Sequence, residues 1–316
     1  MFFVIILLLF TNFLFSQYGG ERNLSKFNPE ISILGDFFLE KNEDRDPEAN
    51  LKEVELSFQS VLDPYTRMKA FIGIHKEEGE EHYHFHLEEG YIIYAGLAKG
   101  LTLEAGKEKQ SFGVYSRYHP HALPTLEYPL YIRNFFGEEG LSAPLISLSY
   151  LFQTIGATTI TAQWGSYEEG NGFLGNLKEF FEINPENYLE IGISYFSLKP
   201  EAKGFHLRYL YEPEEKAKYR NFLIHYEYGE RNHKKGHFLL FERKFSQIFT
   251  LGLALEKSDL LEEDKNLKEM SAIFSFWQSE FVRWRFYFIR EKDEKWSNSY
   301  KLSITFAAGP HKHEEY

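Results

Sequence analysis

The chain has 316 residues, including 31 Phe and 21 Tyr, and contains no cysteine. Disulfide bonds and lipid attachment through a cysteine are therefore excluded, and a formal net charge of −12 argues against nucleic acid as a partner. Aromatic residues make up 18% of the sequence, and such side chains favour β-strands and membrane interfaces.

The first 16 residues have the features of a secretory signal peptide. An apolar run extends from Phe2 to Phe15 and is followed by the small residue Ser16, a suitable cleavage position. The run is too short to cross a membrane comfortably, although an uncleaved anchor is the alternative interpretation. Residues 17–29 are expected to form a short periplasmic segment, with no room for the plug domain of a gated receptor.

From residue 30 onward, apolar and polar residues alternate in runs of about ten residues that end at polar, Gly or Pro turns. This period of two predicts antiparallel strands over residues 30–40, 50–61, 65–75, 82–95, 100–108, 144–152, 156–166, 173–183, 187–198, 203–211, 220–229, 237–245, 247–257, 267–277, 280–290 and 298–308. The total is sixteen, and bacterial outer-membrane barrels have even strand numbers. Residues 173–183 could also form a helix, but removing them leaves an odd count, so parity favours a strand.

The connections between these runs also follow the pattern of a membrane barrel. Short turns such as 62–64 alternate with connections that are mostly longer and charged, such as 41–50 and 167–172. The sequence therefore predicts an all-β fold, a transmembrane antiparallel β-barrel over residues 30–308, followed by a C-terminal tail over 309–316. A soluble β-sandwich also alternates in this way and is the alternative interpretation.

Within the predicted strands, one face is apolar and the other is polar or charged. In VRWRFYFIR, residues 282–290, alternate side chains such as Phe286 are assigned to lipid, and the residues between them are assigned to the lumen. The same alternation assigns a set of basic and histidine side chains to the pore lining. These are Arg67, Lys69, His82, His84, His86, Arg283, Arg285 and Lys301.

Three histidines stand at every second position in HYHFH, residues 82–86. Residues at this spacing share one face only in an extended chain, so the three imidazoles face the lumen, and the residues between them, together with Tyr91, face lipid. Neighbours on one face lie about 7 Å apart. That spacing is too wide for all three to bind one zinc ion, whose ligands lie about 2.0–2.1 Å from the metal. We therefore predict a polar lining here and assign no metal site.

Residues 87–113, LEEGYIIYAGLAKGLTLEAGKEKQSFG, resemble the phosphate-selective porin O/P family of bacterial outer-membrane proteins. The shared features are an acidic and then aromatic strand, a short turn, and a Gly-Lys segment that runs into Phe-Gly. They are carried by Glu89, Tyr91, Gly106, Lys107, Phe112 and Gly113. The chain is also similar to a porin-like subgroup in NPEISILGDF, HPHALP and GPHKHEEY. The resemblance implies a barrel of the predicted size, often trimeric, with the third outside loop folded into the pore.

By its order in the chain, the third outside loop is 110–143, the longest predicted connection. Loops this long without strands of their own are usually functional, and a constriction inside a pore sets size and charge preference. The residues expected at this constriction are Tyr115, Arg117, His119, His121, Glu127 and Arg133. A lid over the barrel mouth is the alternative. We infer no phosphate preference, because inward Arg and Lys residues compete with carboxylates such as Glu53 and Glu227.

Together these features predict an outer-membrane porin that forms a water-filled diffusion channel for small solutes or ions and needs no cofactor. A zinc-type uptake channel that uses the lumenal and loop histidines is the alternative. An enzyme is not expected, because Ser147 and Ser149 lie in no nucleophile motif. The expected partners are outer-membrane lipid, small solutes or ions and, as the resemblance implies, further copies of the chain in a homotrimer, but not nucleic acid.

Overall fold

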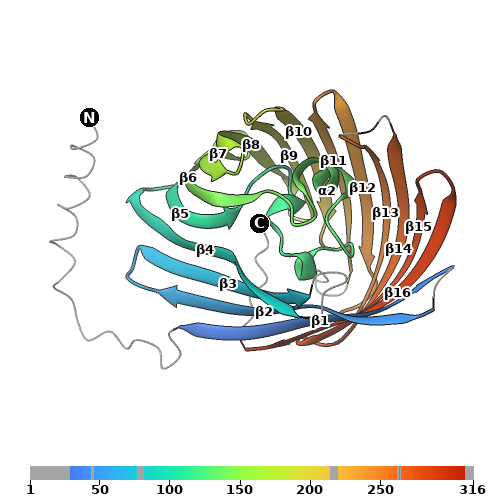
Figure 1. Cartoon of the computed structure of the whole chain (residues 1–316). Coiled ribbons are helices and arrows are strands. Elements are labelled where there is room, and N and C mark those ends of the chain that lie inside the picture. The colour runs from blue at the N-terminus through green and yellow to red at the C-terminus, as the bar shows by residue number, and fades with distance from the viewer. Residues whose placement is uncertain are drawn as a thin grey trace.

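The computed structural model describes residues 29–43, 46–76, 82–213, 220–261, 263 and 265–309. Within these residues, sixteen antiparallel strands form a closed barrel in which each strand pairs with its neighbours in the chain (Figure 1). The first strand, β1 (Glu30–Asn42), closes the barrel by pairing with the last, β16 (Trp296–Ala308). The predicted signal peptide and the tail from residue 310 onward lie outside the described residues.

The other strands are β2 (Glu48–Val61), β3 (Thr66–Lys76), β4 (Tyr83–Ala98), β5 (Leu101–Lys109), β6 (Ser142–Gln153), β7 (Ala157–Tyr167), β8 (Gly170–Asn184), β9 (Asn187–Phe196), β10 (Ala202–Tyr211), β11 (Asn221–Arg231), β12 (Lys234–Lys244), β13 (Phe249–Asp259), β14 (Asn266–Ser279) and β15 (Val282–Lys292). The predicted count of sixteen is confirmed, and residues 173–183 belong to strand β8. Several hairpins are tighter than predicted. Between β11 and β12 the chain turns at Asn232 and His233, both with the positive φ that a two-residue hairpin turn favours.

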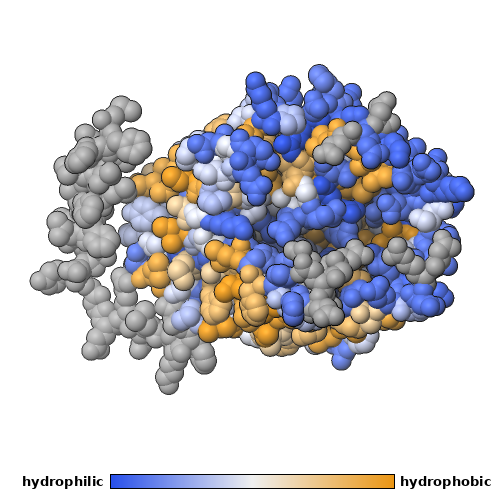
Figure 2. Space-filling view, viewed as in Figure 1, coloured by the Kyte–Doolittle hydropathy of each residue, from blue (hydrophilic) through white to orange (hydrophobic). Residues whose placement is uncertain are grey.

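Side chains alternate between the outer wall and the lumen along most strands. On β15, Phe286 and Phe288 expose 50% and 40% of their surface, whereas Arg285 and Tyr287 are almost completely buried. Figure 2 shows hydrophobic patches on the outer wall and hydrophilic residues around the opening that faces the viewer. Exposed apolar surface of this extent marks contact with lipid or with another protein.

A bulge between β3 and β4 changes which residues of β4 face inward. Phe71 pairs with Glu89 and the next residue pairs with Leu87, so the register skips Glu88, and both Glu88 and Glu89 are buried. The alternation continues beyond the bulge with its phase shifted, and Tyr91 is only 4% exposed. The assignment of Tyr91 to lipid is therefore wrong, because a strict period of two does not anticipate an extra residue.

The connection between β5 and β6, residues 110–141, lies within the ring of strands (Figure 1). It contains two 3-10 turns, Tyr115–Arg117 and Pro120–Ala122, and the short helix α2 (Leu130–Phe136). The helix packs against β11, β12 and β13. No helix in the described part of the chain is long and apolar enough to cross a membrane.

Two glycines on the barrel wall allow α2 to approach closely. A Cβ atom at Gly236 on β12 would lie 2.1 Å from Cβ of Tyr131, and one at Gly229 on β11 would lie 2.5 Å from its ring. Tyr131 is 1% exposed and belongs to a buried cluster with Phe135 and with Phe238 of the wall. The main apolar core of this barrel therefore lies between the loop and one side of the lumen.

Candidate pore constriction

Glu227 on β11 fixes the beginning of the loop to the barrel wall. Its side chain is fully buried, and Oε1 accepts hydrogen bonds from the backbone N–H groups of Val114 (2.8 Å) and Tyr115 (3.3 Å). Oε2 accepts a further one from the hydroxyl of Tyr131, and Nε2 of His225 lies 2.8 Å from Oε1. Because a buried carboxylate needs such donors, Glu227 joins both the first turn and helix α2 to the wall.

His119 joins the middle of the loop to the opposite part of the wall. Its Nδ1 lies 2.9 Å from Oε2 of Glu55 and 3.1 Å from Oε2 of Glu88, and its Nε2 lies 2.9 Å from Oε2 of Glu89. Burial disfavours the charged ring, but these carboxylates outweigh it and hold the pKa of His119 well above its usual range. A protonated ring donates to β2 through one nitrogen and to β4 through the other.

His121 lies beside His119 and extends the same anchor. The two imidazoles stack with their centroids 5.6 Å apart, and Nδ1 of His121 lies 3.7 Å from the Glu55 carboxylate. The backbone carbonyl of His121 accepts a hydrogen bond from the guanidinium of Arg283. The buried guanidinium of Arg285 donates to the carbonyl of Leu123 (3.1 Å). The loop is therefore attached to β2, β4 and β15 within a few residues.

Glu127 and Arg133 form a second polar group farther along the loop. Nη1 of Arg133 lies 2.8 Å from Oε2 of Glu127, and Nη2 lies 3.5 Å from Oε2 of Glu269 on β14. Burial opposes ionisation of Glu127, but Arg133 and Lys52 keep its pKa below the usual value. The Lys52 ammonium also donates to the carbonyl of Leu126 (2.8 Å). This group links the loop to β2 and β14.

The other two predicted constriction residues lie apart from these groups. Tyr115 is 4% exposed and packs edge-on against the rings of His225 and Phe238, so it contributes to the core and not to an open surface. Nη2 of Arg117 lies 4.0 Å from Oε2 of Glu104 on β5, and the side chain is partly exposed. Of the polar groups on the loop, the two histidines are therefore buried against the wall, whereas Arg117 and the Glu127–Arg133 pair are partly exposed.

The residues predicted to line the pore do not form one cluster. Lys301 pairs with Glu40 at 3.2 Å, and Arg67 is exposed near one end of β3. His82 and His84 are exposed, whereas Nε2 of His86 lies 3.7 Å from Oε1 of Glu88. Lys69 is 9% exposed. Two overlapping sets of three residues could hold a metal ion, Glu53–His86–Glu88 and Glu55–Glu88–His119.

Some residues that hold the loop were not expected from the sequence. Oε2 of Glu256 on β13 accepts a hydrogen bond of 2.6 Å from the N–H of Leu130, at the first turn of α2. On the wall itself, Nε2 of His206 on β10 lies 3.4 Å from Oε1 of Glu190 on β9, a pair within the barrel that the sequence did not predict either. All three wall residues occupy inward positions of predicted strands. The alternation could therefore have marked them as lumenal, but it carries no information about what they contact.

An acidic cavity of about 430 Å³ lies beside the loop. Six carboxylates and two basic side chains are part of its lining. These are Glu40, Glu43, Glu127, Glu256, Glu269, Glu291, Arg133 and Lys301. Low-dielectric walls concentrate the field of like charges, so the cavity should attract cations more than anions.

The barrel is similar to several solved outer-membrane proteins. OprB of Pseudomonas putida has a TM-score of 0.65 at 9% identity, covering 89% of this chain and 93% of that one. The trimer form of OmpT, an outer membrane protein of Vibrio cholerae, gives 0.60 at 8% identity, with 88% and 98% covered. An anion-selective porin from Comamonas acidovorans gives 0.59 at 11% identity, also with 88% and 98% covered. At these identities the likeness shows a shared barrel fold.

No family model matches the chain. An uncharacterized protein of Aquifex aeolicus (strain VF5) is 33% identical over 102 residues, or 32% of this chain. The matched region spans 20% of that relative's length.

Proposed function

We propose that the protein is an outer-membrane porin that forms a water-filled diffusion channel for small solutes or ions. The observation that carries the proposal is the closed barrel of sixteen strands with an apolar outer wall and a polar, charged interior. Barrels of eight strands fill their interior with side chains, whereas barrels of about sixteen strands leave an aqueous channel. The shared fold with outer-membrane proteins, a porin among them, supports the same conclusion.

We further propose that residues 110–141 form the constriction. They contact β2 and β4 through His119 and contact β11 through Glu227, so they cross the lumen between distant parts of the wall. Arg117, Glu127 and Arg133, whose side chains are partly exposed, would present their polar groups to permeating solutes. Because this loop contacts the wall on both sides of the lumen, we propose that it is a fixed constriction and not a mobile lid.

The finer assignments are part of the same proposal. The resemblance of residues 87–113 to the phosphate-selective porin O/P family supports a channel of this type, without its phosphate preference. A signal peptide over residues 1–16 would direct the chain across the inner membrane. Assembly as a homotrimer is consistent with the trimer form of the similar OmpT barrel.

Liposome swelling tests the proposal. Vesicles that contain the refolded barrel should swell in monosaccharides, more slowly in disaccharides, and hardly at all in larger sugars, because a constriction sieves by size. Protein-free vesicles are the control. Swelling no faster than that of the control in every sugar would contradict an open channel.

A further inference from the structure

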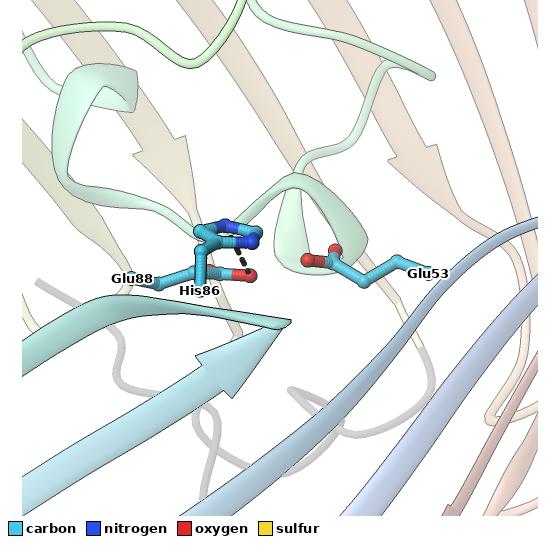
Figure 3. Close-up of side chains that lie close together, drawn as sticks. All are labelled: Glu53, His86 and Glu88. Carbon is cyan, nitrogen blue, oxygen red and sulfur yellow. Dashed lines mark ion pairs between the residues drawn. The ribbon is translucent and has the colours of Figure 1, made fainter. Parts of the chain in front are cut away.

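Three potential metal ligands converge on the inner wall, and one of them, Glu88, also contacts the ring of His119. Glu53 of β2 points toward His86 and Glu88 of β4 across the intervening strand (Figure 3). One ligand atom from each, two carboxylate oxygens and a ring nitrogen, lie within 4.8 Å of one another. Both carboxylates are 8% exposed. Such close carboxylates cannot both be charged unless a cation or a shared proton lies between them.

A glycine on β3 provides the space that these side chains surround. Gly73 lies between β2 and β4, in register with His86. A Cβ atom at this position would lie 2.2 Å from Oε1 of Glu88, 2.9 Å from Oε1 of Glu53 and 2.7 Å from Cε1 of His86. Any other residue at position 73 would therefore fill the point on which the three ligands converge.

Glu88 has one oxygen committed to the loop and one directed into this space. Oε2 lies 3.1 Å from Nδ1 of His119. Oε1 is inaccessible to solvent and has no hydrogen-bond donor within the described residues unless the Glu53 carboxyl is protonated. A buried oxygen without a donor is destabilising, and a bound cation removes that cost.

We propose that Glu53, His86 and Glu88 bind a divalent transition-metal cation such as Zn²⁺ or Mn²⁺. Two carboxylate oxygens and one imidazole nitrogen suit these ions better than Ca²⁺ or Cu⁺. Ligands bonded at about 2.1 Å lie roughly 3.4 Å apart in a tetrahedral site. The 3.7 Å between Nε2 of His86 and Oε1 of Glu88 needs little contraction to reach this distance.

The site is accessible and has room for water ligands. A cavity of about 240 Å³ borders the three ligands and His75, whose ring centroid lies 4.5 Å from that of His86. The ion would also orient Glu88, which carries His119 on its other oxygen. Metal binding would thus stiffen the attachment of the loop to the wall. This role goes beyond solute passage and does not depend on it.

Two titrations of the folded, chelator-treated barrel test the proposal. Binding of Zn²⁺ is measured by calorimetry, and binding of Mn²⁺ by electron paramagnetic resonance. Wild type should bind one ion per chain. Glu53→Gln and Gly73→Ala should weaken binding about tenfold or more. Gly252→Ala is the matched control, because a Cβ there meets its nearest neighbour at an ordinary 3.4 Å and should leave affinity unchanged.

Other outcomes would overturn the site. Wild type that binds neither ion would show that the carboxylates only share a proton. Glu53→Gln that binds as wild type does would show that Glu53 is not a ligand. Zinc lost in a His82→Ala, His84→Ala double variant but retained in Glu53→Gln would place it on the exposed histidines. If the variants do not fold, X-ray absorption of zinc-loaded wild type decides. One imidazole with oxygen ligands supports the proposal, and two or more imidazoles contradict it.

Discussion

Nε2 of His119 lies 2.9 Å from Oε2 of Glu89, and this contact attaches the middle of the long loop to strand β4. Through its other nitrogen the same ring reaches Glu55 of β2. Replacing His119 by Ala would leave buried carboxylates without their cationic partner, and breaking a buried ion pair costs about 3–5 kcal/mol. Denaturant unfolding of the barrel should therefore shift to lower concentration. His84→Ala, which removes an exposed imidazole of the same strand, should unfold as wild type does, and equal midpoints for the two variants would contradict the anchor.

Loss of the second anchor should change conduction. Glu227→Ala removes the acceptor of the N–H groups of Val114 and Tyr115 and of the Tyr131 hydroxyl. The loop should then move, and single-channel current should become larger and noisier. Glu230→Ala, on the same strand but near the turn, is the control. A single-channel current in Glu227→Ala that equals the wild-type current in size and noise would show that the loop does not narrow the pore.

The two faces of β15 and β16 can be tested by introducing charge. Phe286 is 50% exposed on the outer wall, and an Arg there should cost about 2–4 kcal/mol at the membrane midplane. Ser299→Arg places the same group beside the acidic cavity and should be tolerated. The yield of folded barrel is measured for both variants in gels, where the folded protein and the heat-denatured protein migrate differently.

The strand count and most faces were predictable because alternation is a local property of each strand. The bulge that turns both Glu88 and Glu89 inward was not, since a strict period of two does not anticipate where an extra residue enters the ladder. The partners of the loop were not predictable either. Val114 meets Glu227 over a separation of 113 residues, and only the closed barrel brings them together.

Tyr115 illustrates the same limit within the site. Its place in a polar loop suggested a pore-facing ring, whereas the tertiary structure packs it on Phe238. His119 and His121 were both predicted to lie at the constriction, but the sequence does not show that the carboxylate of Glu55 on β2 would face both imidazoles. The sequence shows which polar side chains the loop carries, but it does not show which wall residues they contact.

Charge around the acidic cavity should set ion preference. Glu43 and Glu291 belong to its lining, and replacing both by Lys should lower the preference for K⁺ over Cl⁻ by roughly two- to fivefold. Glu168→Lys, in the turn after β7, makes the same change of charge outside this lining and serves as the control. Reversal potentials in a KCl gradient report the effect. A shift as large in the control as in the double variant would assign selectivity to overall charge.

The most direct test of the channel is single-channel conductance in planar bilayers, with wild type measured beside a variant that lacks about ten residues around His119. We expect wild type to give discrete conductance steps that scale with salt concentration, and the variant with the shortened loop to give larger steps. An absence of steps in wild type would contradict a water-filled pore, and steps of equal size in the two proteins would contradict a constriction at this loop.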